Sequence, residues 1–492
     1  MAKSLTIQGT CSGSGKSLIV TALCRIFSRK GINVAPFKAQ NISLQSYVTR
    51  EGGEIAIAQA VQAEAALIEP EIHMNPILLK PSGKKGFHLI VRGKYRGVIK
   101  PFKKKREVLW DTVVSSLNNM QRKYELLIIE GAGSPAEINI LEQDMANMAV
   151  AEYLKSPVLL VGDIERGGVF ASLYGTVKIL NSKKSFFRGF LINKFRGYRD
   201  ILQPGIDKLE SLLSIKCLGV IPYIDNLAIS DEDGFPFAYS KPKRRQIKKE
   251  KIKIVVIPLK YISNFSDFDP LKFEPDVELA YSLNEDELKE ADIIIIPGSK
   301  RTIEDLQYIK SIGLGAFIKN LAKKDKEIIG ICGGFQMLGD RIIDRHQIES
   351  SKTETRGLGF LSVETIFQPE KILTQVEGSL IEKSSIKIKG YEIHMGESFG
   401  DMNLFKIKRL SYGKIIQEGM IKNNIWGTYI HGLFENDSFR RWLINRHRIK
   451  KGLNPIDFTF SWKRLKESSI EKLADLVEKN VEMKHIEEIL EL

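Results

Sequence analysis

The stretch Ile328-Ile329-Gly330-Ile331-Cys332-Gly333-Gly334-Phe335-Gln336 decides the fold predicted for the second half of this chain. A run of apolar, β-forming residues leads into Gly-x-Cys-x-Gly, and a segment with a helical pattern follows. This is the pattern of a nucleophile elbow, in which glycines permit a sharp strand-to-helix turn and the cysteine sulfur stands above the edge of a sheet. The stretch therefore predicts an α/β domain with nucleophilic acyl chemistry at Cys332, and the alternative is an inert core thiol.

A cysteine nucleophile needs a base that is close in space, though not in sequence. His431 ends the predicted strand Trp426-Gly427-Thr428-Tyr429-Ile430-His431 and is followed by glycine. It is the predicted base. His394, in the stretch 390–397, is the rival, although a structural role is favoured for that histidine taken alone.

The same chemistry needs N–H donors for an oxyanion and a group that orients the histidine. Gly334, at the start of the helix after Cys332, and Gly298, in Pro297-Gly298-Ser299-Lys300 after another apolar strand, are the predicted donors. Glu435 and Glu397 are possible orienting groups, and spacing supports neither, so the third member of the triad stays open.

A second site is predicted in Gly9-Thr10-Cys11-Ser12-Gly13-Ser14-Gly15-Lys16-Ser17, which follows a short apolar strand and opens a helix. Gly13 and Gly15 let backbone N–H groups close on phosphate oxygens, and the helix N-terminus favours negative charge. Lys16 is predicted to reach the β- and γ-phosphates of ATP, and the Ser17 hydroxyl to ligate Mg²⁺. The spacing of the first and last glycines is one residue longer than usual and matches the dethiobiotin-synthetase-like variant.

Three charged residues at the ends of neighbouring predicted strands are candidates for completing the ATP site. Glu130 is the predicted second Mg²⁺ ligand, because the carboxyl ends of parallel strands meet at the edge where the phosphate loop lies. A solvated loop carboxylate is the alternative. Asp163 is a weaker candidate of the same kind. Lys38 could neutralise a transferring phosphoryl group, and a surface lysine is an equally good explanation of its position.

Short apolar strands alternate with helical stretches in the first half, which predicts a mostly parallel, doubly wound sheet. The expected strands there are 5–8, 33–37, 125–130, 157–163, 189–193 and 218–222, with helices at 17–29 and 55–66. A second α/β series has strands at 252–258, 293–297, 328–332, 391–394 and 427–431. The predicted organisation is an ATP-binding domain (1–240), a basic linker (241–252), an α/β domain that carries the Cys332 elbow (253–446) and a helical tail (447–492).

Composition agrees with a folded enzyme of more than one domain. The chain has 492 residues, of which 43% are hydrophobic and 27% charged. The four cysteines form no CxxC pair, and the sequence contains neither a membrane-spanning apolar run nor a signal-peptide pattern, so we expect a cytoplasmic protein. The net charge of +14 is dispersed, and its densest run lies in the predicted linker; we expect neither a nucleic-acid nor a membrane partner.

Over nearly its whole length the chain resembles the cobyric acid synthase family, the glutamine-hydrolysing amidotransferases of cobalamin biosynthesis. Long matched stretches carry the resemblance and are more specific than one phosphate loop. They are 36–41, 53–60, 74–81, 130–139, 163–171 and 193–197 in the first half, and the Cys332 elbow, 390–396 and 427–433 in the second.

This resemblance implies a dethiobiotin-synthetase-like ATP domain joined to a class I glutamine amidotransferase domain, and it places Asn193 among the nucleotide-binding residues. The implied reaction amidates the b, d, e and g carboxylates of adenosylcobyrinic acid a,c-diamide, with L-glutamine as nitrogen donor and ATP as activator. Many class I glutaminases have Glu two residues after the catalytic histidine. Here Leu433 stands at that position, as in the resembled family.

Other functions compete with this one. The a,c-diamide synthase of the same pathway has the same pair of domains, and the stretches 193–197 and 38–41 favour cobyric acid synthase over it. A non-enzymatic P-loop switch of the partition-ATPase kind would explain the first half but not the pairing of Cys332 with His431. The oligomeric state, the corrin-binding residues and the ammonia path are left open.

Overall fold

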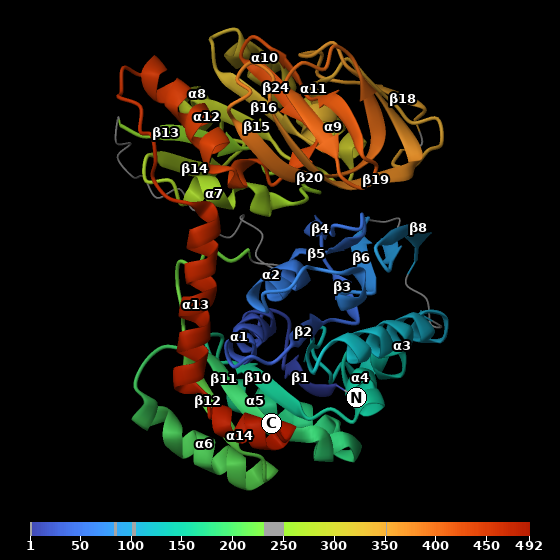
Figure 1. Ribbon diagram of the computed structural model, residues 1–492, viewed down its shortest axis with the longest axis vertical. Coiled ribbons are helices and arrows are strands. Elements are labelled where there is room, and N and C mark those ends of the chain that lie inside the picture. The colour runs from blue at the N-terminus through green and yellow to red at the C-terminus, as the bar shows by residue number, and fades with distance from the viewer. Residues whose placement is uncertain (1, 83–85, 101–104, 231–249, 351) are drawn as a thin grey trace. The chain divides into compact units, whose positions relative to one another are not determined.

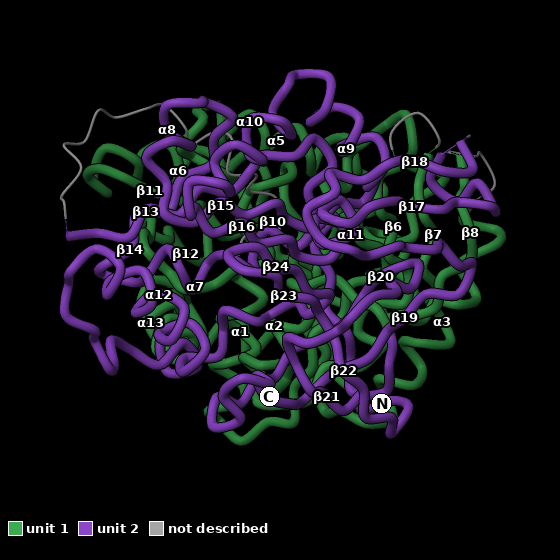
Figure 2. The backbone as a smooth tube through the Cα atoms, turned by 90° about the horizontal axis from the view of Figure 1, so that it is seen from above, with its two compact units in different colours: residues 1–43, 54–233, 466–492 green, residues 44–53, 234–465 purple. Residues whose placement is uncertain are grey.

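The computed structural model describes residues 2–82, 86–100, 105–230, 250–350 and 352–492. The chain forms two compact units, coloured separately in Figure 2. Unit 1 comprises Met1–Ser43, Glu54–Asp233 and Lys466–Leu492, and unit 2 comprises Leu44–Gly53 and Gly234–Leu465. The predicted basic linker lies mostly outside the described residues.

Unit 1 is built on a six-stranded sheet in the order β12-β11-β10-β1-β9-β2, with every neighbouring pair parallel (Figure 1). The strands are β1 (Lys3–Gly9), β2 (Val34–Phe37), β9 (Leu126–Glu130), β10 (Val158–Asp163), β11 (Phe187–Phe195) and β12 (Cys217–Pro222). Each lies within two residues of its predicted bounds. The first strand of the chain is central, so the phosphate loop after β1 opens at the middle of the sheet edge.

Helices cover both faces of this sheet, which confirms the doubly wound prediction. Alternate residues of β10 point to opposite faces: Leu159 and Val161 pack with α1, α13 and α14, whereas Val158 and Leu160 pack with α5 and α6. The helices of unit 1 are α1 (Lys16–Arg29), α2 (Ile57–Ala65), α3 (Lys105–Lys123), α4 (Met148–Leu154), α5 (Val169–Ile179), α6 (Arg199–Leu213), α14 (Met483–Leu490) and, from Lys466 on, α13 (Trp462–Asn480).

The C-terminal helices complete the core of unit 1, although almost 450 residues separate them from α1 in the chain. Ile470 and Leu473 of α13 are buried against the α1 face, and Arg25 of α1 forms ion pairs with Glu467 and Glu471. The sequence predicted a helical tail without a docking surface. The structure supplies that surface, because an apolar face of the sheet would otherwise lie uncovered.

Unit 1 also contains a small mixed sheet that the sequence did not predict. It has the order β3-β6-β7-β8, in which only β3 and β6 are parallel. The strands are β3 (Gln40–Ile42), β6 (Ile77–Pro81), β7 (Phe87–Val91) and β8 (Lys94–Ile99). Two short strands, β4 (Ser46–Val48) and β5 (Glu54–Ala56), follow β3 in the chain.

Unit 2 has a second sheet in the order β14-β13-β15-β16-β24-β23, parallel except for the edge pair β23 and β24. Its strands are β13 (Ile252–Val256), β14 (Val277–Tyr281), β15 (Ile293–Ile296), β16 (Glu327–Ile331), β23 (Met420–Lys422) and β24 (Ile425–Thr428). The helices of this unit are α7 (Asp269–Lys272), α8 (Glu285–Glu290), α9 (Thr302–Ser311), α10 (Leu314–Ala322), α11 (Gly333–Leu338) and α12 (Asp437–Lys450).

A separate, largely antiparallel sheet in unit 2 corrects part of the predicted series. The expected strand 391–394 belongs to the long β20, which pairs antiparallel with β19, and the expected strand 427–431 is divided between β24 and β25. The strands of this sheet are β17 (Arg341–Ile343), β18 (Glu354–Arg356), β19 (Glu364–Leu380), β20 (Lys387–Phe399), β21 (Phe405–Arg409), β22 (Lys414–Glu418) and β25 (Ile430–His431). The division matters because it carries the chain from one sheet to the other just before His431.

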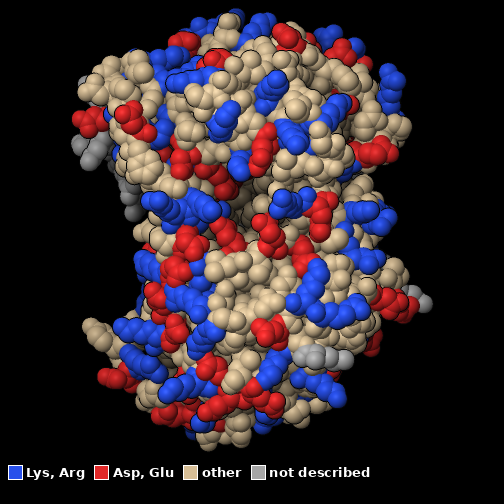
Figure 3. All heavy atoms as spheres, in the orientation of Figure 1, with Lys and Arg blue, Asp and Glu red and all other residues tan. Residues whose placement is uncertain are grey.

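On the face drawn in Figure 3, Lys and Arg side chains are interspersed with Asp and Glu. Within the described residues, no helix combines the length and the apolar character that crossing a membrane requires.

Candidate active site

Cys332 stands at a strained turn between β16 and α11. Its backbone has φ 51° and ψ −109°, a conformation that L residues rarely adopt and that costs about 1–3 kcal/mol. Gly334 is required for close approach, because a Cβ there would lie 1.9 Å from the carbonyl oxygen of Ile296. These features are those of a nucleophile elbow, with the side chain lifted out at the carboxyl end of the parallel sheet.

His431 is buried at the end of β25 and is held by a carboxylate. Its Nδ1 lies 2.6 Å from Oδ2 of Asp267, and Oδ1 of Asp267 accepts the N–H of Gly432 over 2.9 Å. Cys332 also acts on the His431 ring and raises its pKa. Burial alone would lower the pKa of His431, but the charges of Asp267 and Cys332 outweigh burial and raise it to about 10. The arrangement favours the protonated form of the His431 ring.

Asp267 is the carboxylate that contacts His431, and sequence reasoning missed it. It lies 164 residues before His431, in the short 3-10 helix η6 (Phe265–Phe268) after β13. In the sequence, Asp267 is distinguished only as a carboxylate in a polar loop that follows the buried strand β13, and β13 belongs to the same sheet as β16. Glu435 and Glu397, the two groups considered from the sequence, are both exposed.

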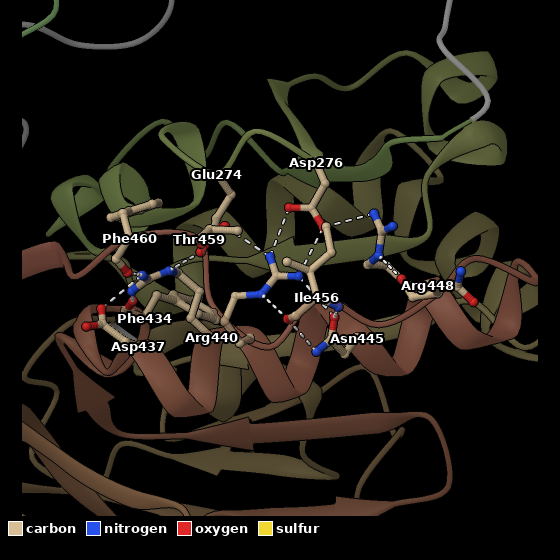
Figure 4. A network of polar contacts seen from close by, with 12 residues as sticks. Glu274, Asp276, Phe434, Asp437, Arg440, Asn445, Arg448, Ile456, Thr459 and Phe460 are labelled. Carbon is tan, nitrogen blue, oxygen red and sulfur yellow. Dashed lines mark hydrogen bonds and ion pairs between the residues drawn. The ribbon is translucent and has the colours of Figure 1, made fainter.

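A network of buried ion pairs anchors the segment that carries Asp267 (Figure 4). Arg440 of α12, which is fully buried, donates from Nε to Glu274 over 2.6 Å. Arg441 donates to Glu274 over 3.0 Å and to Asp276 over 2.9 Å. Because Glu274 follows η6 and α7, these pairs fix the loop against α12, and α12 itself begins six residues after His431.

His394 is part of a buried cluster, as expected for a histidine with a structural role. Its ring stacks on Tyr429 with centroids 3.7 Å apart, and Nδ1 lies 2.8 Å from the carbonyl oxygen of Gly396. Glu392 lies 3.6 Å from its Nε2 and is itself bonded by Arg409. Nδ1 of His394 therefore has a backbone partner, and its Nε2 faces Glu392 without a hydrogen bond.

The two glycines predicted to hold an oxyanion lie beside the Cys–His pair. A Cβ on Gly298 would come 3.4 Å from Cε1 of His431, so the backbone of Gly298 flanks the His431 ring. Gly334 lies in the first turn of α11, two residues after Cys332. Their role as N–H donors stays a prediction.

The predicted ATP site gathers its charged residues around Glu130. Oε1 of Glu130 accepts hydrogen bonds from Ser17 Oγ and Lys38 Nζ, each over 2.8 Å, and Oε2 accepts one from Gln62 Nε2 over 2.5 Å. Burial alone would raise the pKa of Glu130, but the Lys38 ammonium, together with Gln62 and Lys16, holds it below its ordinary value. Glu130 is therefore an anion next to the serine of the phosphate loop. Gln62, on α2, was not predicted from the sequence.

The phosphate loop has the geometry that a polyphosphate requires. Gly13 and Gly15 adopt φ values of 71° and 96°, and a Cβ on Gly15 would come 2.0 Å from Nδ2 of Asn193. That same Nδ2 donates to the carbonyl oxygen of Ser14 over 2.9 Å and so braces the loop. The buried Oγ of Ser14 has no hydrogen-bond partner among the described residues. A bound phosphate oxygen would satisfy it.

Two further predicted residues are placed as follows. Lys16 Nζ donates to the carbonyl oxygens of Cys11 and Gly133, each over 3.0 Å, and so lies across the loop. Asp163, the weaker metal candidate, instead accepts from Lys194 Nζ over 2.9 Å and from the N–H of Glu165.

The donor set fits Mg²⁺ shared with a nucleotide. Across the described residues, no group of three or more His, Cys, Asp or Glu side chains is arranged to hold a metal. Ser17 and Glu130 do present two adjacent oxygen donors. Mg²⁺ in nucleotide sites takes one or two protein oxygens and completes its shell with phosphate and water.

Both halves of the chain match described families. Residues 5–237 match the CobQ/CobB/MinD/ParA nucleotide binding domain, and residues 253–439 match the CobB/CobQ-like glutamine amidotransferase domain. The chain is 59% identical to a cobyric acid synthase of Thermodesulfovibrio yellowstonii over 491 residues, 99% of each chain. It is 44% identical to that of Caldanaerobacter subterraneus subsp. tengcongensis and 46% identical to that of Clostridium botulinum strain Loch Maree, each over 100% of this chain and 99% of the relative. With 59% identity over the full length of a relative, this chain belongs to the cobyric acid synthase family.

Proposed function

We propose that this protein amidates the b, d, e and g carboxylates of adenosylcobyrinic acid a,c-diamide, using ATP and L-glutamine, and that it works in the cytoplasm. The observation that carries the proposal is the presence in one chain of a Cys–His–Asp constellation and a phosphate loop with an adjacent carboxylate, in a full-length relative of cobyric acid synthases. A nitrogen donor site and a carboxylate-activating site are the two parts that such a reaction needs.

The unit with the phosphate loop would activate the acceptor. A carboxylate is a poor acyl donor, because its leaving group would be oxide. Transfer of the γ-phosphoryl group of ATP to a carboxylate oxygen forms an acyl phosphate and ADP. Lys16 and Lys38 would stabilise the charge of the transferring group. Ser17 and Glu130 would hold Mg²⁺, which when bound neutralises charge on the phosphates. Ammonia then attacks the acyl carbon and expels phosphate.

The unit with the elbow would release that ammonia from glutamine. The Cys332 thiolate attacks the side-chain amide carbon, and the oxyanion forms beside Gly298 and Gly334. His431 donates its proton to the leaving nitrogen, so that ammonia departs and a γ-glutamyl thioester remains. Water, deprotonated by His431, then hydrolyses the thioester to glutamate. Asp267 keeps the imidazole in the tautomer that both steps require.

Mass spectrometry of the corrinoid tests this function. Adenosylcobyrinic acid a,c-diamide, incubated with the protein, Mg-ATP and glutamine, is expected to lose about one mass unit per amidation, up to four times, because OH is exchanged for NH₂ by way of the acyl phosphate. Two amidations of cobyrinic acid itself, with no change in the a,c-diamide, would assign the protein to the preceding step instead. No change in either corrinoid would contradict the proposal.

A further inference from the structure

The loop that follows β15 lies against both His431 and the nucleophile elbow. This loop, residues 297–300, is here called the Gly298 loop. A Cβ on Gly298 would come 3.4 Å from Cε1 of His431, and a Cβ on Gly333, in the elbow, would come 2.8 Å from the backbone nitrogen of Ser299. The position of the Gly298 loop therefore decides where its N–H groups stand relative to the thiol of the elbow.

A second stretch of unit 2, residues 261–264, runs antiparallel to the Gly298 loop and is here called the facing segment. One β-bridge and two backbone hydrogen bonds, of 2.8 and 2.9 Å, join the two stretches: Ile262 with Ser299, the Lys300 N–H to the Tyr261 carbonyl oxygen, and the Ser263 N–H to that of Gly298. The facing segment continues into η6, where the N–H of Asp267 donates to the carbonyl oxygen of Asn264 over 3.0 Å. The two stretches thus form a small ribbon that carries Gly298 on one side and leads to Asp267 on the other.

Asp305, in the first turn of α9, bonds both halves of this ribbon through one oxygen. Its Oδ2 accepts hydrogen bonds from Oγ of Ser299 over 2.6 Å and from the N–H of Tyr261 over 3.2 Å. Oγ of Ser299 in turn accepts the N–H of Arg301 over 3.0 Å. The carboxylate therefore fixes the Gly298 loop and the facing segment to each other and to the start of α9.

An anion at this place is costly. Asp305 is only 1% exposed, and burial raises its pKa to about 6. Its Oδ1 has no hydrogen-bond partner among the described residues. A buried carboxylate costs more free energy than an uncharged side chain of similar size unless its bonds compensate. The need for one acceptor that serves donors from two separate stretches explains an aspartate here.

We propose that Asp305 is a positioning residue of the glutaminase site, acting through Ser299 on the Gly298 loop and through Tyr261 on the facing segment. This rests on the proposed function. Asp305 thereby holds the predicted oxyanion donor and the segment that leads to Asp267 in register with the nucleophile. Because the oxyanion forms only after attack on the amide, a displaced donor weakens binding of the transition state more than binding of glutamine.

Steady-state glutamate release from glutamine is the first test. Asp305→Ala removes both bonds made by Oδ2, and we expect kcat to fall by about 100-fold, the loss that a misplacement of about 1 Å can cause. The KM for glutamine should stay within about twofold of wild type, because the lost interaction belongs to the transition state. Asp401→Ala, which changes an exposed aspartate of the same unit, should keep the wild-type kcat.

The conservative variant and a double variant identify the bonds that matter. Asp305→Asn keeps an oxygen that can accept from both Ser299 and Tyr261, so its kcat should lie within about threefold of wild type. Ser299→Ala removes one of the two bonds and should lower kcat by about tenfold. Adding Ser299→Ala to Asp305→Ala should lower kcat by no more than about a further twofold, since the bond between the two residues is already lost.

Two measurements without turnover distinguish a shift of the Gly298 loop from damage to the nucleophile. Alkylation of Cys332 by iodoacetamide forms an S–C bond and releases iodide without an oxyanion. Its rate, followed by mass spectrometry of the peptide that contains Cys332, should stay within about twofold of wild type in Asp305→Ala. Hydrogen exchange should be faster in peptides spanning 259–268 and 296–301 of Asp305→Ala, and unchanged in Asp305→Asn.

The outcomes separate this inference from the function on which it rests. A wild-type kcat in Asp305→Ala, or a kcat in Asp305→Asn as low as that in Asp305→Ala, would overturn the positioning role. Unaltered exchange in both peptides of Asp305→Ala would overturn it as well. A wild type that releases no glutamate would contradict the proposed function, and the exchange data would then still decide whether Asp305 fixes the Gly298 loop.

Discussion

Replacing Asp267 by Asn tests the glutaminase constellation at its least expected member. The amide keeps the size of the side chain and an oxygen that can still accept the Gly432 N–H, but it removes the charge that faces Nδ1 of His431 at 2.6 Å. A hydrogen bond to a charged group contributes about 1.5–3 kcal/mol. Since 1.36 kcal/mol is tenfold in rate, we expect kcat for glutamine hydrolysis to fall by about 10- to 150-fold.

The same variant has a defined effect on pH dependence. In the wild type, burial lowers the pKa of His431 but Asp267 and Cys332 raise it to about 10, above its ordinary value of 6.5. The imidazolium, and the stability it contributes, are therefore fully present below about 6.5 and lost as the pH rises through about 10. In Asp267→Asn the carboxylate no longer raises the pKa of His431, while burial still lowers it. We therefore expect the pKa of His431 to fall. The alkaline limb of kcat/KM should then move to lower pH.

Steady-state glutamate release, measured across pH for Asp267→Asn and the wild type, checks both expectations. Asp286→Asn is the matched control, because its carboxylate is on the surface of the same unit in an exposed pair with Lys289. A variant with a kcat within about twofold of wild type and an unmoved alkaline limb would refute the role assigned to Asp267.

Three further changes test other parts of the molecule. Lys16→Ala should abolish amidation while some glutamine hydrolysis persists, and amidation that survived would show that the ATP site is wrongly assigned. Gly334→Ala places a methyl group 1.9 Å from the Ile296 carbonyl oxygen and should reduce glutamine hydrolysis by at least about 100-fold, with amidation from ammonium salts retained. Glu274→Ala leaves Arg440 and Arg441 without their shared carboxylate and should lower the free energy of unfolding by about 3–5 kcal/mol, seen as an earlier urea midpoint in tryptophan fluorescence; an unchanged midpoint would contradict the anchoring role of the network.

The parts of the fold that the sequence predicted well are those with local signals. The parallel strands are short apolar runs because helices bury both of their faces. The phosphate loop and the elbow contain glycines because the backbone there adopts a positive φ, as at Gly15, or approaches another backbone closely, as at Gly334. The strand predicted at 391–394 is part of β20, and its antiparallel pairing with β19 was not predicted, because residues 391–394 are buried without the alternation that an exposed face would give.

The missed features depend on contacts between distant parts of the chain. Asp267 is one of many carboxylates in loops, and only the packing of η6 beside β25 distinguishes it. The docking of α13 required pairing Arg25 with Glu467 across more than 400 residues. Leu44–Gly53 is a polar stretch that belongs to unit 2, where Asn264 bonds the Ser46 backbone, and no periodicity in the sequence indicates that contact.

The most direct test of the account follows nitrogen from one site to the other. The protein is given adenosylcobyrinic acid a,c-diamide, Mg-ATP and glutamine labelled with ¹⁵N in its side-chain amide, and the corrinoid is analysed by mass spectrometry. The account predicts up to four ¹⁵N atoms per product with the wild type, none with Cys332→Ala, and unlabelled amides when ammonium salt is added to that variant. Labelled product from Cys332→Ala, or amidation without ATP, would contradict it.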